Sequence, residues 1–390
     1  MTLPAAPVNA HARVCDVTSP GAPLRLRAGG VLDPVRATYE TWGELDEAGS
    51  NAVFVCHALT GDAHVAKHHG ADEPGWWDVM VGPGRPIDTS RYHVICANVL
   101  GGCGGTTGPW SPAPDGRPLG TTFPEVHVAD MVHVHRRLLA DLGIGRLRAV
   151  IGGSLGGMQA LQWYLQAPQE ADAFLVIAGS ARLSADNLAW NAVSRAAILA
   201  DPGFAGGHYL DDASPAVGLG IARMIGHLTY LSVESLETKF GRAPLRHPVR
   251  ETHPVMGPSF SVEGYLDHQA RKLVDRFDAN TYLYLMRAMD SFDPFHDLGP
   301  LDDDHARARV ELFSFVGDRL FGPGHSDFIR AELERRAASV RHYREAVRTV
   351  GHDAFLLEVP TYLAAVRERL APAPRRASRP RLSRSSARAA

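Results

Sequence analysis

The sequence AVIGGSLGGMQALQW, residues 149–163, decides the fold, because it places one serine among four glycines between an apolar run and a helical pattern. Residues 152–156 fit G-x-S-x-G, the pattern of a tight turn that raises a nucleophilic serine between a strand and a helix. Side chains on the neighbouring residues would collide in such a turn, so glycine is used on both sides. The bare pattern is common by chance, and a glycine-rich turn with an idle serine is the alternative. The flanking strand and helix favour Ser154 as a nucleophile.

Five short apolar runs predict a mostly parallel β-sheet, because continuous runs are typical of strands that are buried on both faces. Helical patterns lie between several of them, as in VADMVHVHRRLLADLG (128–143), where Gly143 is placed to end the helix. The predicted class is therefore α/β, with helices on both faces of the sheet. The five runs are NAVFVC (51–56), YHVICAN (92–98), RAVIGG (148–153), AFLVIAG (173–179) and VELFSFVGD (310–318).

Residues 185–295 interrupt this alternation and have the pattern of several helices, so we predict a helical lid inserted into the sheet domain. The expected organisation is a first core part at 1–184, the lid at 185–295, a second core part at 296–370 and a tail at 371–390. The tail, APAPRRASRPRLSRSSARAA, contains six arginines and no acidic residue. It has too little apolar surface to fold, and we expect a solvated, disordered end.

The composition is that of a soluble globular protein: 45% of the 390 residues are hydrophobic, 21% are charged and the net charge is −3. No overall basic surface is implied, so no nucleic-acid partner is expected. Four cysteines are too few for a disulfide scaffold and lack the spacing of a metal site. No apolar run approaches the ~18 residues of a membrane span, and the first twenty residues do not resemble a secretory signal. We therefore expect a cytoplasmic protein without a membrane partner.

A nucleophilic serine needs a base and an acid that orients it, and behind a turn of this kind they follow in the order Ser, Asp, His. Asp318 follows the apolar run at 310–316, and His352 follows a glycine in VGHDAFL. Both are expected at the carboxyl ends of strands, where ligands gather. We predict Ser154, Asp318 and His352 as the catalytic residues.

Other histidines compete for the role of the base. His64, His68 and His69 in HVAKHHG have a metal-like spacing, but no H-E-x-x-H motif accompanies them. We interpret them as an exposed histidine-rich loop and predict no metal site. His227 lies within an apolar helical pattern and is interpreted as a packed structural residue.

The negative charge that develops during attack on a carbonyl needs two backbone N–H donors. One donor should follow the nucleophile, at Leu155, and the other should come from a loop after an early strand. The segment VFVCHALTGDAH (53–64) supplies such a loop, and we assign the second donor to Leu59.

Several long motifs resemble the homoserine O-acetyltransferase family of the α/β-hydrolase fold, over residues 20–370. The resemblance implies an acetyl transfer from acetyl-CoA to L-homoserine through an acyl-serine, by a ping-pong mechanism, in methionine biosynthesis. It also implies a homodimer that forms through the helical insertion, and no permanently bound cofactor. The motifs are CHALTGDAH (56–64), GWWDVMVGPGRPIDTSRYHVICANVLGGCGGTTGP (75–109), GGSLGGMQALQW (152–163), ARMIGHLTYLS (222–232), KFGR (239–242), FDANTYLYLMRAMD (277–290) and GHDAFLLE (351–358).

By the same resemblance, Arg223 would bind the carboxylate of the amino acid and Asp353 its ammonium group. A planar guanidinium suits a carboxylate, and an anion suits an ammonium. A lid-helix ion pair for Arg223 and a loop cap for Asp353 are the alternatives from the residues alone.

Three positions depart from the family pattern. The elbow reads Ser-Leu-Gly where members often have Ser-Met-Gly, and Arg319 follows Asp318 where members commonly have tryptophan. Leucine stands at 320, where succinyl-CoA users of the related group tend to have an arginine two residues after the aspartate. The adjacent Arg319 leaves the donor open, although acetyl is favoured. A homoserine O-succinyltransferase, a serine O-acyltransferase, an ester hydrolase and a non-catalytic binding module remain as alternatives.

Overall fold

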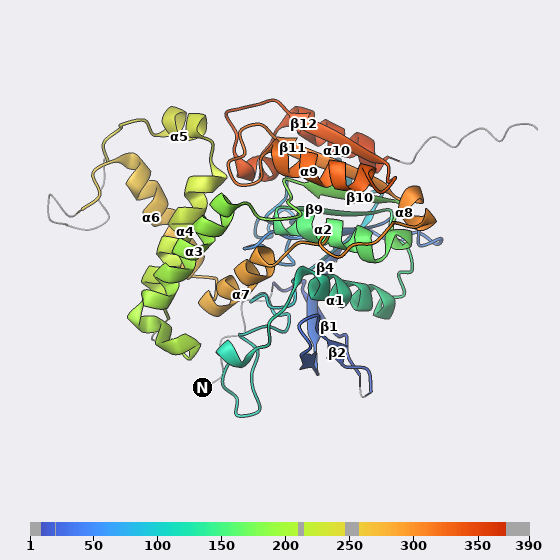
Figure 1. Ribbon diagram of the computed structural model, residues 1–390, viewed down its shortest axis with the longest axis horizontal. Coiled ribbons are helices and arrows are strands. Elements are labelled where there is room, and N and C mark those ends of the chain that lie inside the picture. Colours follow the sequence, from blue (N-terminus) through green and yellow to red (C-terminus); the bar gives the residue numbers. More distant parts are fainter. Residues whose placement is uncertain (1–8, 20, 210–213, 246–256, 372–390) are drawn as a thin grey trace, which may run out of the picture.

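A mostly parallel sheet of eight strands forms the centre of the computed structural model, which describes residues 9–19, 21–209, 214–245 and 257–371 (Figure 1). All neighbours from β8 to β12 pair in parallel, whereas β4 is antiparallel to both β1 and β8. The predicted α/β class is confirmed. In spatial order the strands are β1 (Arg13–Asp16), β4 (Arg36–Trp42), β8 (His93–Ala97), β5 (Ala52–Cys56), β9 (Ala149–Gly153), β10 (Ala173–Ile177), β11 (Arg309–Phe315) and β12 (Val340–Glu345).

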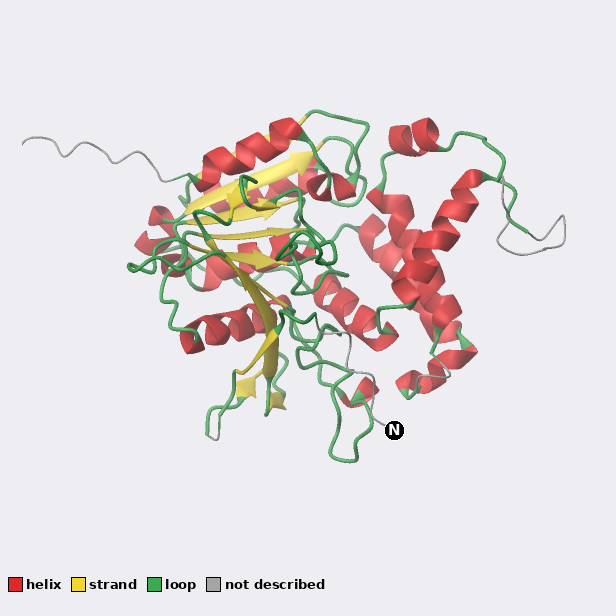
Figure 2. Cartoon of the chain, turned by 180° about the vertical axis from the view of Figure 1, so that it is seen from behind, coloured by secondary structure: helices red, strands yellow, loops and turns green. Residues whose placement is uncertain are grey.

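Helices cover both faces of the sheet, as Figure 2 shows from behind. Successive residues of a strand point to opposite faces, so Phe54 belongs to one apolar cluster and its neighbours Val53 and Val55 to the other. The first cluster packs under α1 (Val128–Asp141), α2 (Leu155–Gln166) and α9 (Pro323–Glu334), and the second under α10 (Pro360–Leu370). Both faces of the central strands are therefore buried.

The helices of the insertion stand to one side of the sheet (Figure 1). Side-chain caps start two of them: Ser184 accepts a hydrogen bond from the N–H of Asn187, and Asp278 accepts one from Thr281. The insertion contains α3 (Ala185–Ala200), η3 (Pro202–Gly207), α4 (Ala216–Tyr230), α5 (Val233–Lys239), α6 (Ser261–Val274) and α7 (Ala279–Asp290).

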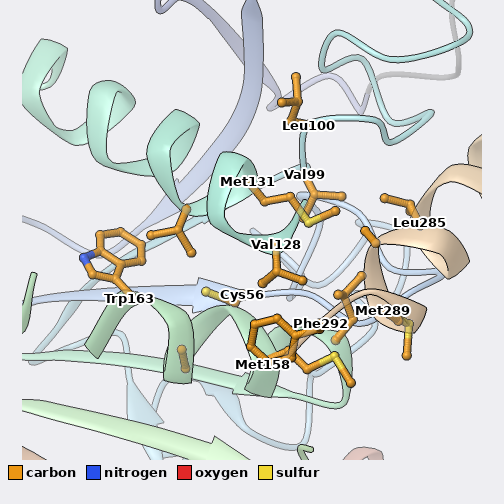
Figure 3. Packing of buried hydrophobic residues seen from close by; sticks show 14 of the residues in the cluster. Cys56, Val99, Leu100, Val128, Met131, Met158, Trp163, Leu285, Met289 and Phe292 are labelled. Atoms are coloured by element: carbon orange, nitrogen blue, oxygen red, sulfur yellow. The ribbon is translucent and has the colours of Figure 1, made fainter. Parts of the chain in front are cut away.

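The last of these helices, α7, packs directly on the core. Leu285 and Met289 of α7 lie in the same cluster as Met158 of α2 and Val128 of α1 (Figure 3). The apolar core therefore continues from the sheet domain into the insertion without a polar break.

Short elements complete the described chain. They are β2 (Leu24–Arg25) paired with β3 (Val31–Leu32), β6 (Val81–Gly82) paired with β7 (Ile87–Asp88), the helix α8 (Asp303–Arg307), and the 3-10 helices η1 (Gly120–Thr122), η2 (Pro168–Glu170) and η5 (His352–Leu356).

Within the described ranges no single helix is long and apolar enough to span a membrane; α4 and α5 reach the length and composition of a span only together, as a pair bent by 103°. The predicted disorder of the basic tail concerns residues of which all but Ala371 lie outside the described chain.

Candidate active site

The turn at Ser154 has the geometry that its glycines predict. β9 ends at Gly153 and α2 begins at Leu155, which leaves Ser154 between them with φ of 59°, a left-handed value that is unfavourable for a residue with a side chain. A Cβ atom added at Gly156 would lie 2.1 Å from the carbonyl oxygen of Cys56. Only glycine fits there, and the close approach of the backbone fixes the serine at the end of the strand.

Three loops at the carboxyl edge of the sheet bring Ser154, Asp318 and His352 together. Nε2 of His352 lies 2.9 Å from Oγ of Ser154, and its Nδ1 lies 2.8 Å from Oδ2 of Asp318. Asp318 follows β11, and His352 begins η5 in the connection after β12. All three side chains are buried.

The carboxylate of Asp318 is held from two sides. Its Oδ1 accepts hydrogen bonds of 2.8 Å from the N–H groups of Leu320 and Phe321, which leaves Oδ2 to accept the proton on Nδ1 of His352. The other ring nitrogen then presents its lone pair to the hydroxyl of Ser154. Burial alone lowers the pKa of His352, but Asp318 and Asp353 outweigh it and raise this pKa above its ordinary value. The ring is thus oriented and tuned to accept a proton from the serine.

The two predicted backbone donors border the serine. Leu155 begins α2, where the first N–H groups of a helix have no partner within the helix. Leu59, in the turn after β5, lines the same cavity as Ser154.

Sequence reasoning missed the residue that holds this turn, His57. Its Nε2 accepts hydrogen bonds from the N–H of Val99 (3.0 Å) and the amide of Asn98 (3.1 Å), so its proton is on Nδ1, which donates to the oxygen of Ala58 (2.7 Å). Burial lowers the pKa of His57, in agreement with a neutral ring. A signal was present: His57 and Asn98 each come directly after an apolar run, and neighbouring parallel strands bring such residues together.

The cavity above Ser154 is small, with a volume of about 40 Å³, and lies between the sheet domain and the lid. None of the described residues that line it has a charged side chain. Leu320 is among them, whereas the exposed Arg319 donates a hydrogen bond to the oxygen of Leu228 at 2.9 Å. The lining residues are Leu59, Ser154, Leu183, Asn187, Trp190, Asn191, Ser194, Ile225, Gly226, Thr229, Tyr230, Tyr282, Met286, Met289, Leu320 and Phe321.

Arg223 and Asp353 meet at the side chain of Tyr230, on the edge of this cavity. The guanidinium carbon of Arg223 lies 5.5 Å from the centre of the Tyr230 ring, and its Nη1 lies 3.4 Å from Oγ1 of Thr60. Its Nε is buried and has no hydrogen-bond partner within the described chain. Burial raises the pKa of Asp353, while the charges of His352 and Arg223 act in the opposite direction. Opposite charges therefore lie near Tyr230, which is one of the residues that line the cavity.

The prediction that His64, His68 and His69 lie in an exposed loop is wrong for the first two. His64 and His68 are largely buried, and both contact Oε2 of Glu40 on β4, at 2.9 and 2.8 Å. A carboxylate that is 1% exposed needs hydrogen-bond donors, and these two rings supply them. His69 is exposed as predicted. His227 is buried in α4, where burial lowers its pKa to about 3.

Similarity to known proteins covers most of the chain. The α/β-hydrolase fold family matches residues 51–359. A homoserine O-acetyltransferase of Symbiobacterium thermophilum is 48% identical over 353 residues, which are 89% of this chain and 92% of that protein. A homoserine O-succinyltransferase of a Nocardioides species is 47% identical over 356 residues, 90% of this chain and 95% of the relative. The crystal structure of a homoserine O-acetyltransferase from Bacillus anthracis has a TM-score of 0.81 at 26% identity, and covers 92% of this chain and 97% of its own.

Proposed function

Since the chain belongs to the homoserine O-acyltransferases of the α/β-hydrolase fold, we propose that it transfers an acetyl group from acetyl-CoA to the hydroxyl of L-homoserine. The observation that carries the proposal is the hydrogen-bonded chain from Ser154 through His352 to Asp318, below a cavity whose described lining is uncharged. The product, O-acetyl-L-homoserine, would serve methionine biosynthesis.

In the first half of the reaction, His352 takes the proton of Ser154, and the serine oxygen attacks the thioester carbon of acetyl-CoA. The N–H groups of Leu59 and Leu155 stabilise the oxyanion, with a contribution of roughly 3 kcal/mol per donor. The carbon–sulfur bond breaks, and His352 gives its proton to the leaving CoA thiolate. Ser154 is left as an acetyl ester.

In the second half, His352 takes the proton of the homoserine hydroxyl, whose oxygen attacks the acetyl-serine. The ester bond to Ser154 breaks, and His352 returns the proton to the serine oxygen. Asp318 keeps the imidazole in one tautomer and stabilises its charged form throughout. No step needs a metal ion or a permanently bound cofactor.

An acetyl donor suits the cavity better than a succinyl donor. The free carboxylate of a succinyl group needs a cation or several donors when it is taken out of water. Among the described lining residues no cation is present, and Leu320 occupies the position where related succinyl-CoA users tend to have arginine. The homoserine O-acetyltransferase and O-succinyltransferase relatives are about equally identical to this chain in sequence. The preference for an acetyl donor therefore rests on the cavity.

Recognition of the acceptor is assigned to the two charges beside Tyr230. Arg223 has an unpartnered, buried Nε that a carboxylate of homoserine would satisfy. Asp353 adjoins His352, so an ammonium group held there brings the hydroxyl of the same molecule towards the base. Serine is shorter by one methylene, which discriminates by only about 1–3 kcal/mol.

We also propose a cytoplasmic homodimer. Large apolar side chains on α3 and α4 are more than two-fifths exposed, and such a surface is typical of an interface. A second copy would cover them; analytical ultracentrifugation should therefore give twice the mass of the chain. The side chains are Leu188, Val193 and Leu199 of α3 and Val217 and Ile221 of α4.

The test of the reaction combines acetyl-CoA or succinyl-CoA with homoserine, serine or water, and follows CoA release and product mass. Acetyl-CoA with homoserine should be the fastest pair by at least about 10-fold. Faster transfer from succinyl-CoA would mean that the donor is succinyl-CoA, and faster transfer to serine would mean that the acceptor is serine. Faster hydrolysis than transfer would make the protein an esterase.

The acyl-serine is tested at Ser154 itself. Intact-mass spectrometry of the protein with acetyl-CoA alone should show one added acetyl group, located on Ser154 by peptide mapping. Ser154→Ala should fold and lose transfer by at least about 10⁴-fold, because no other group can form the ester. An acetyl group on another residue, or an active alanine variant, would overturn the mechanism.

A further inference from the structure

Two imidazoles and one carboxylate converge behind the turn of Leu59 and take no part in the proposed reaction. Nδ1 of His64 and Nε2 of His68 contact the same oxygen of Glu40, and one nitrogen or oxygen from each of the three residues lies within 4.8 Å of the other two. The side chain of Glu40 is 1% exposed, while those of His64 and His68 are 13% and 16% exposed. The cluster is thus shielded from water but reachable.

The ring of His64 is oriented in the manner of a metal ligand. Its Nε2 lies 2.9 Å from the backbone oxygen of Glu73, which can only accept a hydrogen bond, so Nε2 carries a proton. Metal-bound imidazoles usually have this arrangement, with the far nitrogen donating to a carbonyl or carboxylate. Nδ1 of His64 then faces the carboxylate oxygen of Glu40, and these two atoms cannot both present a bare electron pair. A cation must lie between them, either a proton or a metal ion.

The ring of His68 is held by stacking. It lies between the rings of His11 and Trp42, with centroid distances of 4.1 and 4.7 Å and interplanar angles of 29° and 16°. Aromatic rings on both sides restrict rotation of the imidazole while its Nε2 points to Glu40. Both rings are therefore pre-oriented towards the carboxylate, although they come from an irregular segment without helix or strand.

Two further acidic groups lie near the cluster. Asp62 lines the same cavity as Glu40 and His64, and Oδ2 of Asp72 lies 4.0 Å from Nε2 of His64. Arg276 is the one arginine or lysine among the described residues that line this cavity. The amide nitrogen of Asn9 lies 2.9 Å from Nδ1 of His64 and would be displaced by an ion. Negative charge thus exceeds positive charge around the space that a divalent cation would take.

We propose that Glu40, His64 and His68 form a binding site for a divalent transition metal ion, and that Zn²⁺ is the ion that suits it. Two imidazoles and one carboxylate are a donor set that zinc uses, with the fourth position left to water. Magnesium and calcium prefer oxygen ligands alone, so they should not bind here. The ion would be structural, because it links β4 to the segment that follows the Leu59 turn.

Full-length protein, stripped with a chelator and dialysed, should bind one Zn²⁺ per chain in isothermal titration, with a rise in the melting temperature. Mg²⁺ at the same concentration should give neither effect. Co²⁺, which has visible absorption in a tetrahedral site of nitrogen and oxygen ligands, should give a spectrum that Zn²⁺ abolishes. Absence of stoichiometric Zn²⁺ binding would mean that the cluster holds only a proton, and would overturn the proposal.

Substitutions distinguish Zn²⁺ binding at this site from Zn²⁺ binding by other histidines. His68→Ala should weaken Zn²⁺ binding by at least about 10-fold and remove the Co²⁺ spectrum, since even outer partners of metal ligands change affinity by 10–100-fold. Glu40→Gln should have the same effect, and circular dichroism checks that this variant folds. If the buried glutamine prevents folding, the test rests on His68→Ala. His296→Ala, which removes a side chain that is 77% exposed, is the matched control and should bind normally. Unchanged binding in His68→Ala would assign the metal to surface histidines and overturn the proposal.

Discussion

At the scale of single residues, the groups proposed to act on the acyl donor and the group proposed to bind the acceptor carboxylate come from different parts of the fold. Ser154 and His352 lie at the sheet edge, whereas Arg223 belongs to helix α4 of the insertion. A guanidinium with a buried, unpartnered Nε is costly unless a ligand satisfies it. This arrangement makes the two half-reactions separable by substitution.

Arg223→Ala should raise the KM for homoserine by on the order of 100-fold, because a substrate carboxylate would be left unpaired in a partly dry site. The burst of CoA from acetyl-CoA alone should survive, since acylation of Ser154 does not need the acceptor. Rapid-quench measurement of the burst and steady-state kinetics check both parts. Arg319→Ala, which removes an exposed guanidinium bound to a lid carbonyl, is the control and should change neither by more than about twofold. Loss of the burst with normal homoserine affinity would place Arg223 on the CoA side or in the fold.

The pH dependence of acylation should follow His352. This histidine must be neutral to accept a proton, so the rate falls when the pH drops through its pKa. Asp318 and Asp353 raise that pKa despite burial, so the acid limb of kcat/KM for acetyl-CoA should lie above pH ~6.5, the ordinary value. Asp353→Asn removes one of the two charges and should shift this limb to lower pH, as measured by CoA release without homoserine.

The control for this shift is Asp297→Asn, which neutralises a side chain that is 84% exposed. It should leave the acid limb in place. If Asp353→Asn leaves the limb unmoved or shifts it to higher pH, the charge of Asp353 does not act on the base.

At the scale of secondary-structure elements, the sequence identified five of the six interior strands of the sheet. The sixth, β4, was missed because its buried Thr38 and Glu40 interrupt the apolar pattern. The five apolar runs correspond to β5, β8, β9, β10 and β11, because both faces of these strands are buried and leave a continuous pattern. β12 reads VRHYRE and β1 reads RVCD; both are edge strands with partly exposed side chains, so no apolar run marks them.

The candidate site was predictable to the extent that local patterns encode it. The elbow at Ser154 is a local motif, and Asp318 and His352 follow local strand and glycine signals. The burial of Glu40 with His64 and His68 is set by tertiary packing of an irregular segment against β4, which no periodic pattern reports. His57 differs, because it follows a predicted strand and could have been found there, although its partners lie 41 and 42 positions away.

The turn that carries Leu59 should depend on His57. His57→Ala removes the ring that accepts from Val99 and Asn98, so the turn loses its anchor and kcat should fall by on the order of 100-fold, the effect of losing one oxyanion donor. The KM for homoserine should change less than kcat, because the link between this turn and an acceptor group, within the described chain, is the 3.4 Å contact of Thr60 with Arg223. Steady-state kinetics separate kcat from KM.

His305→Ala is the control, because His305 is also buried and contacts Asp302 and the oxygen of Leu165 rather than the turn or its partners. Both variants should lower the melting temperature, but only His57→Ala should lower kcat strongly. Equal losses of kcat would show that His57 serves the fold and not the donor.

At the scale of the whole molecule, the last residues should be dispensable. Deletion of residues 372–390 removes an arginine-rich segment without acidic residues, which has too little apolar surface to pack. Turnover should stay within about twofold, and the mass in solution should still be that of a dimer. Kinetics and analytical ultracentrifugation of the truncated chain check both. A loss of activity or of the dimer would show that the segment docks on the folded body.

The lid and the sheet domain share one apolar interior, because Leu285 and Met289 of α7 belong to the same cluster as Met158 of α2 (Figure 3). Exchange of the whole insertion between related enzymes would therefore disturb the packing of the sheet domain. A crossover at residues 185 and 295 would bring foreign side chains into this layer, and each mismatch in volume costs about 1–5 kcal/mol. A chimera that takes only residues 185–274 from its donor keeps the α7 of the host, but Ile198, Leu219 and Leu273 of α3, α4 and α6 belong to the same cluster, so their replacements would still have to match it.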